Sequence, residues 1–172
     1  MVRLEPRAVF THCYGHSLNL ACSDAVKGSK LMRNALDIVR EITKLVKLPP
    51  RQNAIFQQLK EGLSEKSPGI RILCLTRWTV RAQALKSILD NYQVLLRLWD
   101  ESLDIVKEHD MRGCILGVST CMMTYDFFFG VVLGELLLRH SDNLSKSLQT
   151  TQMSAAKGQE VATMTIQALL SL

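Results

Sequence analysis

The feature that most constrains the fold of this chain is the strongly apolar stretch at residues 111–140. Within it, residues 114–138 are long enough to cross a bilayer, so they must lie either in a membrane or in a protein core. Asp126 lies at the middle of this run, and Thr124 and Glu135 also interrupt it. A carboxylate at mid-membrane costs about 2.5–3.5 kcal/mol. We therefore expect no membrane segment, but a buried core helix or a broken pair of helices. Close helix approach is expected at three glycines, Gly117, Gly130 and Gly134.

The rest of the pattern predicts a mainly helical fold that begins with one short β-strand at residues 7–12. At residues 30–47 apolar side chains recur three and four positions apart, and Pro49-Pro50 ends this predicted helix. A lone strand needs a partner, because an unpaired edge exposes backbone donors and acceptors. The other helices are expected at residues 17–26, 53–63, 77–108, 141–148 and 155–170, with Ser17, Thr76 and Ser141 as N-caps.

Charge is distributed unevenly along the chain. Residues 1–86 carry 15 Lys and Arg against 6 Asp and Glu, a net of +9, whereas residues 87–172 carry 6 against 10, a net of −4. An anionic partner would therefore dock on the first half, unless the asymmetry is only a dipolar surface. The five cysteines are odd in number and show no paired spacing, and no secretory signal opens the chain. We expect reduced thiols in an intracellular compartment.

Residues 11–20 place His12, Cys13 and His16 close together at the predicted strand-to-helix junction. The spacing C-x-x-H is a zinc half-site, but zinc needs four ligands, or three and a water, and no second pair has ligand spacing. Cys13 as a nucleophile would need an oriented base that the sequence does not reveal. We favour a structural role, in which Cys13 packs and His16 hydrogen-bonds at the junction, and expect no metal site.

Arg77, Trp78 and Arg81 form a candidate nucleic-acid-binding site. The two arginines are four positions apart near the N-terminus of a predicted helix, where free N–H groups and partial positive charge suit phosphate. Trp78 offers a flat surface on which a base can stack, worth about 1–3 kcal/mol. The alternative is that Trp78 is a core residue and that the arginines are solvated or salt-bridged.

Basic residues also follow one face of the helix predicted at residues 30–47. They are Arg33, Arg40, Lys44 and Lys47. Asp37 and Glu41 lie beside them and can form ion pairs three positions apart with Arg40 and Lys44. The pattern is more typical of a salt-bridged, solvent-exposed face than of a binding surface.

The sequence carries no recognisable signal for catalysis. It contains no glycine-rich phosphate loop, no G-x-S-x-G and no H-E-x-x-H. Its carboxylates are scattered, whereas two-metal phosphoryl transfer needs converging carboxylates to hold the ions. No catalytic site can therefore be named from these patterns, and we expect no cofactor or small-molecule substrate.

With these residues in view, the sequence resembles the hAT (hobo/Activator) superfamily of transposases, and within it the transposase-derived zinc finger MYM-type protein one-like group. Four blocks carry the match in order over essentially the whole chain: residues 8–20, 73–78, 84–92, and 125–130 with 144–149. The first two blocks contain C-x-x-H and Leu-Thr-Arg-Trp, and together they are the most specific part of the match.

The resemblance implies a ribonuclease-H-like core that is interrupted by a large helical insertion. Residues 1–16 would be a residual core strand and its junction, and residues 17–172 would be the helical insertion domain. The C-x-x-H of the family falls on Cys13 and His16. Its tryptophan, associated with the DNA end being cut and with a flipped base, falls on Trp78.

The catalytic Asp, Asp and Glu of the family, which hold a divalent metal such as Mg²⁺, match no residue of this chain. The resemblance therefore implies a nuclear, non-catalytic remnant of an hAT-type DNA transposase, with DNA as the expected partner. The alternative is a helical protein–protein interaction module that forms homo-oligomers or binds a transposase-like protein, without nucleic-acid binding.

Overall fold

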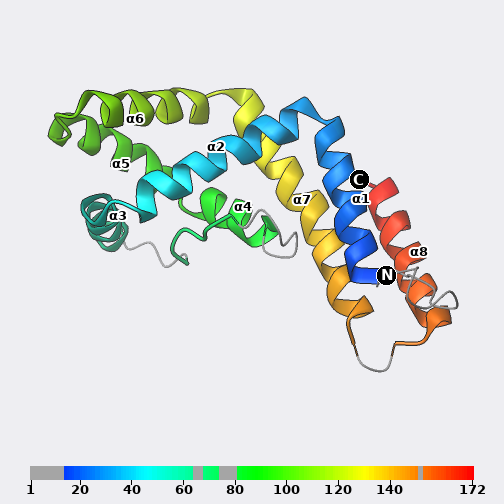
Figure 1. The fold of residues 1–172 in the computed structure, drawn as a ribbon. Coiled ribbons are helices and arrows are strands. Elements are labelled where there is room, and N and C mark those ends of the chain that lie inside the picture. The colour runs from blue at the N-terminus through cyan, green and yellow to red at the C-terminus, as the bar shows by residue number, and fades with distance from the viewer. Residues whose placement is uncertain (1–13, 64–67, 74–80, 151–152) are drawn as a thin grey trace, which may run out of the picture.

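The described part of the protein is built from helices. The computed structural model describes residues 14–63, 68–73, 81–150 and 153–172 (Figure 1). Over these ranges it contains eight α-helices and no strand. They are α1 (Tyr14–Gly28), α2 (Lys30–Lys47), α3 (Pro50–Gly62), α4 (Arg81–Asp90), α5 (Tyr92–Ile105), α6 (His109–Met122), α7 (Tyr125–Leu148) and α8 (Ala155–Leu170). The mainly helical fold class is confirmed, and the strand predicted at residues 7–12 lies outside the described residues.

Two predicted helices are confirmed with both of their boundaries, and each begins at a serine cap. The Ser29 hydroxyl accepts a hydrogen bond from the Met32 backbone N–H at 3.3 Å at the start of α2. The Ser154 hydroxyl accepts from the Lys157 N–H at 3.2 Å at the start of α8. Each cap satisfies one of the N–H groups that the first turn of a helix leaves without an internal partner.

Other boundaries were predicted incorrectly. The apolar stretch is a broken pair: α6 ends at Met122, and Thr124 caps α7 by accepting from the Phe127 N–H at 3.2 Å. The predicted break at Ser141 is wrong, because its hydroxyl donates to the Leu137 carbonyl at 3.1 Å inside a continuous α7. Ser17 is likewise not a cap, since it lies inside α1. The third helix starts earlier than expected, at Pro50, where a missing N–H costs nothing.

The helix predicted at residues 77–108 is divided at Asn91 into α4 and α5. The Asn91 side-chain amide donates to the Ser87 carbonyl and to the Pro68 carbonyl, both at 2.8 Å. A side chain that bonds the backbone in this way competes with the regular helical ladder. The division lets α4 pack against α7, while α5 turns away to pack against α3 and α6.

The arrangement has two groups of helices that share α2 (Figure 1). In one group α1, α2, α4 and α8 all contact the long α7. In the other, α5 packs against α3 and α6, and α2 contacts both of these helices as well. Trp99 of α5 is the largest fully buried side chain, and its indole Nε1 donates to Met122 Sδ at 3.0 Å.

Two glycines allow α7 to approach its neighbours closely. A Cβ at Gly130 would lie 2.9 Å from Ala35 Cβ, and one at Gly134 would lie 3.0 Å from Leu85 Cδ1. The first distance is shorter than real Cβ contacts and the second would require the Leu85 side chain to shift, so both glycines are close-approach positions as predicted. The prediction is wrong for Gly117, where an added Cβ would meet nothing within 4 Å.

Within the described ranges, no single helix is long and apolar enough to cross a membrane. Taken together, α6 and α7 meet the length and composition criteria, but they are bent by 74° at their junction.

Candidate functional site

Most of the residues that the sequence singled out lie outside the described part of the chain. This holds for Arg77 and Trp78 of the predicted nucleic-acid site, and for His12 and Cys13 of the junction motif. His16 lies in the first turns of α1, and Arg81 is the first residue of α4. The Arg81 side chain is buried and, like His16, has an interaction partner.

The segment before the predicted site is bound firmly to α4. The Arg71 backbone N–H donates to Ser87 Oγ at 3.0 Å, and the Arg71 guanidinium donates to Gln83 Oε1 at 2.6 Å. Ile70 and Leu73 are buried in the core beneath it. The described residues nearest to Arg77 and Trp78 in the sequence are thus Leu73 and Arg81, and both are buried.

The basic face of α2 is salt-bridged, as predicted. Arg40 Nη2 lies 3.4 Å from Asp37 Oδ1, and Lys44 Nζ lies 2.9 Å from Glu41 Oε1. Arg33 instead donates to the Lys27 carbonyl at the end of α1. Exposed pairs of this kind contribute about 0–1 kcal/mol each, and they offset two of the five positive charges that α2 carries.

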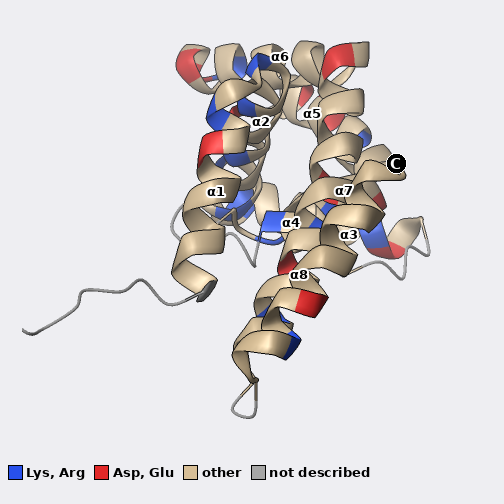
Figure 2. Ribbon diagram, turned by 90° about the vertical axis from the view of Figure 1, so that its right-hand side faces the viewer, with Lys and Arg blue, Asp and Glu red and all other residues tan. Residues whose placement is uncertain are grey.

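Ion pairs also neutralise cations on other helices. Lys27 pairs with Asp24, Lys86 with Asp90, and Arg139 with Glu135. Figure 2 shows basic and acidic positions interspersed over the helices. Carboxylates on the same helices therefore offset part of the positive charge on the described residues.

No group of three or more His, Cys, Asp or Glu side chains that could hold a metal ion occurs in the described ranges. Cys22, Cys114 and Cys121 are free thiols, and Cys114 is exposed.

An exposed apolar face on α7 is the feature that sequence reasoning missed. Tyr125 is 74% exposed and Phe129 is 41% exposed, and their rings stack with centroids 5.6 Å apart. Phe128 is also exposed and contacts Tyr92 edge-to-face at 5.8 Å. The prediction of a fully buried helix is wrong on this side, because only the opposite side of α7 packs against other helices. Helical spacing alone would have grouped these residues on one face.

Tyr92 of α5 is hydrogen-bonded to the end of α6, close to the start of this apolar face. Its hydroxyl donates to the Met122 carbonyl at the end of α6, which satisfies one of the carbonyls that a helix end leaves unpaired. Burial raises the pKa of the Tyr92 hydroxyl. The aromatic side chains of α7 thus lie next to the bend between α6 and α7, where the Tyr92 hydrogen bond to Met122 is made.

No protein-family model matches the chain. No solved structure was found to match it. Function is therefore argued from the surfaces and cavities of this structure.

Proposed function

We propose that this chain is a non-catalytic helical domain derived from an hAT-type transposase, and that it acts as a protein-association module. The family assignment is supported by the sequence blocks described above and is compatible with a mainly helical fold. The association role is supported best by a single observation, the exposed apolar face of α7.

Four side chains on α7 define this face: Tyr125, Phe129, Val132 and Leu136. Their spacing of four, three and four residues places them on one side of a helix. Tyr125, Phe129 and Val132 are exposed, and Leu136 is half-buried. A contiguous row of this kind is typical of a surface that another helix covers.

A second copy of the chain is the partner that we propose. Apart from the buried Asp142, the acidic and basic side chains of α7 are equal in number, with Asp126 and Glu135 against Arg139 and Lys146. Two copies can therefore meet through this face without net repulsion between like charges. The Glu135–Arg139 pair, at 3.6 Å, leaves neither group without a partner at the edge of the face.

Replacing Phe129 with glutamate is expected to weaken self-association at least about 100-fold, because each copy would bury a charge in place of an aromatic ring. Sedimentation velocity over a concentration series would measure the change. Met164→Glu is the matched control: Met164 is an exposed apolar residue on α8, and its replacement should leave the association unchanged. Circular dichroism of both variants would verify that the helices remain intact.

A wild-type chain that sediments as a monomer at high concentration would contradict this proposal. Equal weakening by Phe129→Glu and Met164→Glu would also contradict it, because the association would then be non-specific.

Residual nucleic-acid binding is a second candidate function, and the attachment of residues 68–73 to α4 favours it. That attachment fixes the described residues that precede Arg77 and Trp78 in the sequence. Arg71, within this attached stretch, is exposed and supplies a further cation. DNA is the proposed ligand.

Filter binding of a DNA oligonucleotide at two salt concentrations tests this candidate. Affinity should fall steeply as salt increases, because each phosphate contact releases counterions. Replacing Arg77 and Trp78 together with alanine should weaken binding by about 10-fold or more. The control is the double variant Arg97→Ala with Lys157→Ala, whose cations lie on α5 and α8. Absence of binding at low salt would rule the function out.

A further inference from the structure

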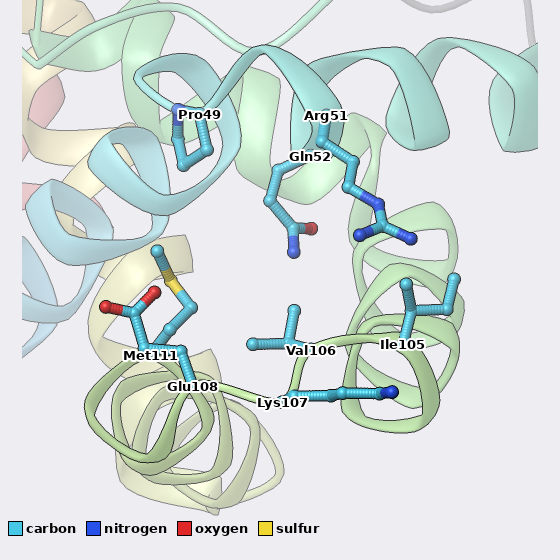
Figure 3. A pocket seen from close by; sticks show the side chains of 8 residues that line it. All are labelled: Pro49, Arg51, Gln52, Ile105, Val106, Lys107, Glu108 and Met111. Atoms are coloured by element: carbon cyan, nitrogen blue, oxygen red, sulfur yellow. The ribbon is translucent and has the colours of Figure 1, made fainter.

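A cavity of about 460 Å³ lies where the start of α3 meets the α5–α6 connection (Figure 3). Pro49, Arg51 and Gln52 contribute one wall, and residues 105–108 with Met111 contribute the others. Segments about fifty residues apart in the sequence thus line one open pocket. None of its lining residues belongs to the aromatic face of α7 or to α4.

The buried Gln52 side chain turns a hydrogen-bond donor toward this cavity. The side chain is only 3% exposed, and its Oε1 accepts a hydrogen bond from the buried Ser102 hydroxyl at 2.7 Å. Figure 3 shows the amide nitrogen directed into the cavity. No described residue accepts a hydrogen bond from this nitrogen. The Oε1 contact fixes the amide in this orientation, so the N–H groups are available to an acceptor atom of a ligand.

Two helix N-termini converge on the same space. The N-cap positions of α3 and α6 are Pro49 and Glu108, both of which line the cavity. Neither residue forms a side-chain capping bond. The first-turn N–H groups of both helices are therefore left without a side-chain acceptor, and each helix contributes about half a positive charge at its start. The start of α3, whose first turn contains no acidic residue, favours an anion, whereas Asp110 in the first turn of α6 offsets part of the positive charge there.

Two cations add to this positive field. Arg51 and Lys107 line the cavity, are exposed, and make no ion pair with a described residue. They differ in this respect from the paired cations of α2, α4 and α7. Glu108 is the one carboxylate in the lining, and Figure 3 places it on the Met111 side, across the cavity from Arg51.

We propose that this cavity binds a small organic phosphate. Arg51, Lys107, the Gln52 amide and the two helix starts would together supply donors for a group with several anionic oxygens. The remaining walls, which include Val106 and Met111, are apolar and suit a small hydrocarbon or aromatic body on the phosphate. No small-molecule ligand was expected from the sequence, and this site goes beyond the association role proposed for α7.

Calorimetric titration of the full chain with phenyl phosphate at low salt tests the site, with inorganic phosphate as a second probe. Phenyl phosphate should bind more tightly than inorganic phosphate, because its ring contacts the apolar wall. The variant Gln52→Glu keeps an acceptor for Ser102 but replaces the donor with a negative charge, and should weaken binding about 10-fold or more. Arg51→Gln should also weaken it, whereas Lys157→Gln on α8, which removes the same charge elsewhere, should not.

A direct readout is the Gln52 side-chain amide signal in a nitrogen–proton correlation spectrum, which should move when phenyl phosphate is added. The proposal is overturned if phenyl phosphate fails to bind at about 10 mM, or if Lys157→Gln weakens binding as much as Arg51→Gln. Because Arg51 is exposed, Arg51→Gln keeps the test decisive even if Gln52→Glu disturbs folding. Binding by Phe129→Glu should match the wild type, which separates this site from the α7 surface.

Discussion

Replacing Trp99 with alanine is expected to lower the free energy of unfolding by about 3–5 kcal/mol, the largest effect of any change considered. Trp99 is 0% exposed and lies on α5, where its indole N–H donates to the Met122 sulfur of α6. Truncation would remove a large buried surface and leave a cavity where α5 meets α6. It would also leave the Met122 thioether without its donor, and Met122 is itself fully buried.

Chemical denaturation followed by circular dichroism would measure this loss, because the helical signal does not depend on tryptophan fluorescence. Trp99→Phe should cost less, since it keeps most of the apolar volume. Leu116→Ala on α6 is the surface control, because Leu116 is 57% exposed and its truncation should change stability by less than about 1 kcal/mol. A loss for Trp99→Ala no larger than for Leu116→Ala would show that α5 and α6 do not pack as described.

Asp142→Asn is expected to stabilise the fold at pH 7 by up to about 3 kcal/mol. Asp142 lies on α7 and is only 5% exposed. Burial raises the pKa of its carboxyl from 3.8 to about 6, although the positive charge of Lys146 opposes part of this rise. At pH 7 the native protein must hold this carboxylate ionised in a poorly solvated position, and the asparagine amide removes that cost.

The same raised pKa predicts how stability depends on pH. Between pH 3.8 and about 6 the folded chain binds a proton at Asp142 that the unfolded chain has released. The contribution of Asp142 is therefore most favourable below pH 3.8, and it declines as the pH rises through about 6. The difference in unfolding free energy between Asp142→Asn and the wild type should grow over this window.

Urea denaturation at a series of pH values would measure that difference. Asp126→Asn is the matched control, because Asp126 is an exposed carboxylate in the first turn of the same helix. The negative charge of Asp126 interacts favourably with the positive end of the α7 dipole. Its removal should therefore lower the free energy of unfolding by about 0.3–1 kcal/mol at pH 7. Equal effects of the two substitutions at pH 7 would contradict the assignment of a raised pKa to Asp142.

Apolar spacing and end-capping residues were sufficient to predict a helix when both kinds of signal agreed on its ends. Residues 30–47 show regular apolar spacing, a serine before the helix and two prolines after it, and all three signals agree on α2. The division at Asn91 was not predictable in the same way. It depends on a hydrogen bond to the Pro68 carbonyl, which is distant in the sequence, and apolar periodicity continues across it. Tertiary contacts decided that boundary.

The functional surfaces were harder to predict than the helices. The apolar spacing of α7 identified a helix that needs burial, but it could not say that Phe129 would face solvent while Gly130 would touch Ala35. The cavity beside Gln52 is invisible to local pattern, because its walls come from the start of α3 and from the α5–α6 connection. Gln52 is a polar residue near a helix start, and only the Ser102 contact from another helix shows that it is buried.

The position of α2 has a consequence for how the protein loses its structure. This helix contacts α1 and α7 on one side of the molecule and α3 and α6 on the other. Either group can open locally while the other still covers part of α2, so release of α2 requires both groups to separate. The shared helix therefore couples the two groups into a single cooperative folding unit, in keeping with one hydrophobic core cluster that includes buried residues of both groups.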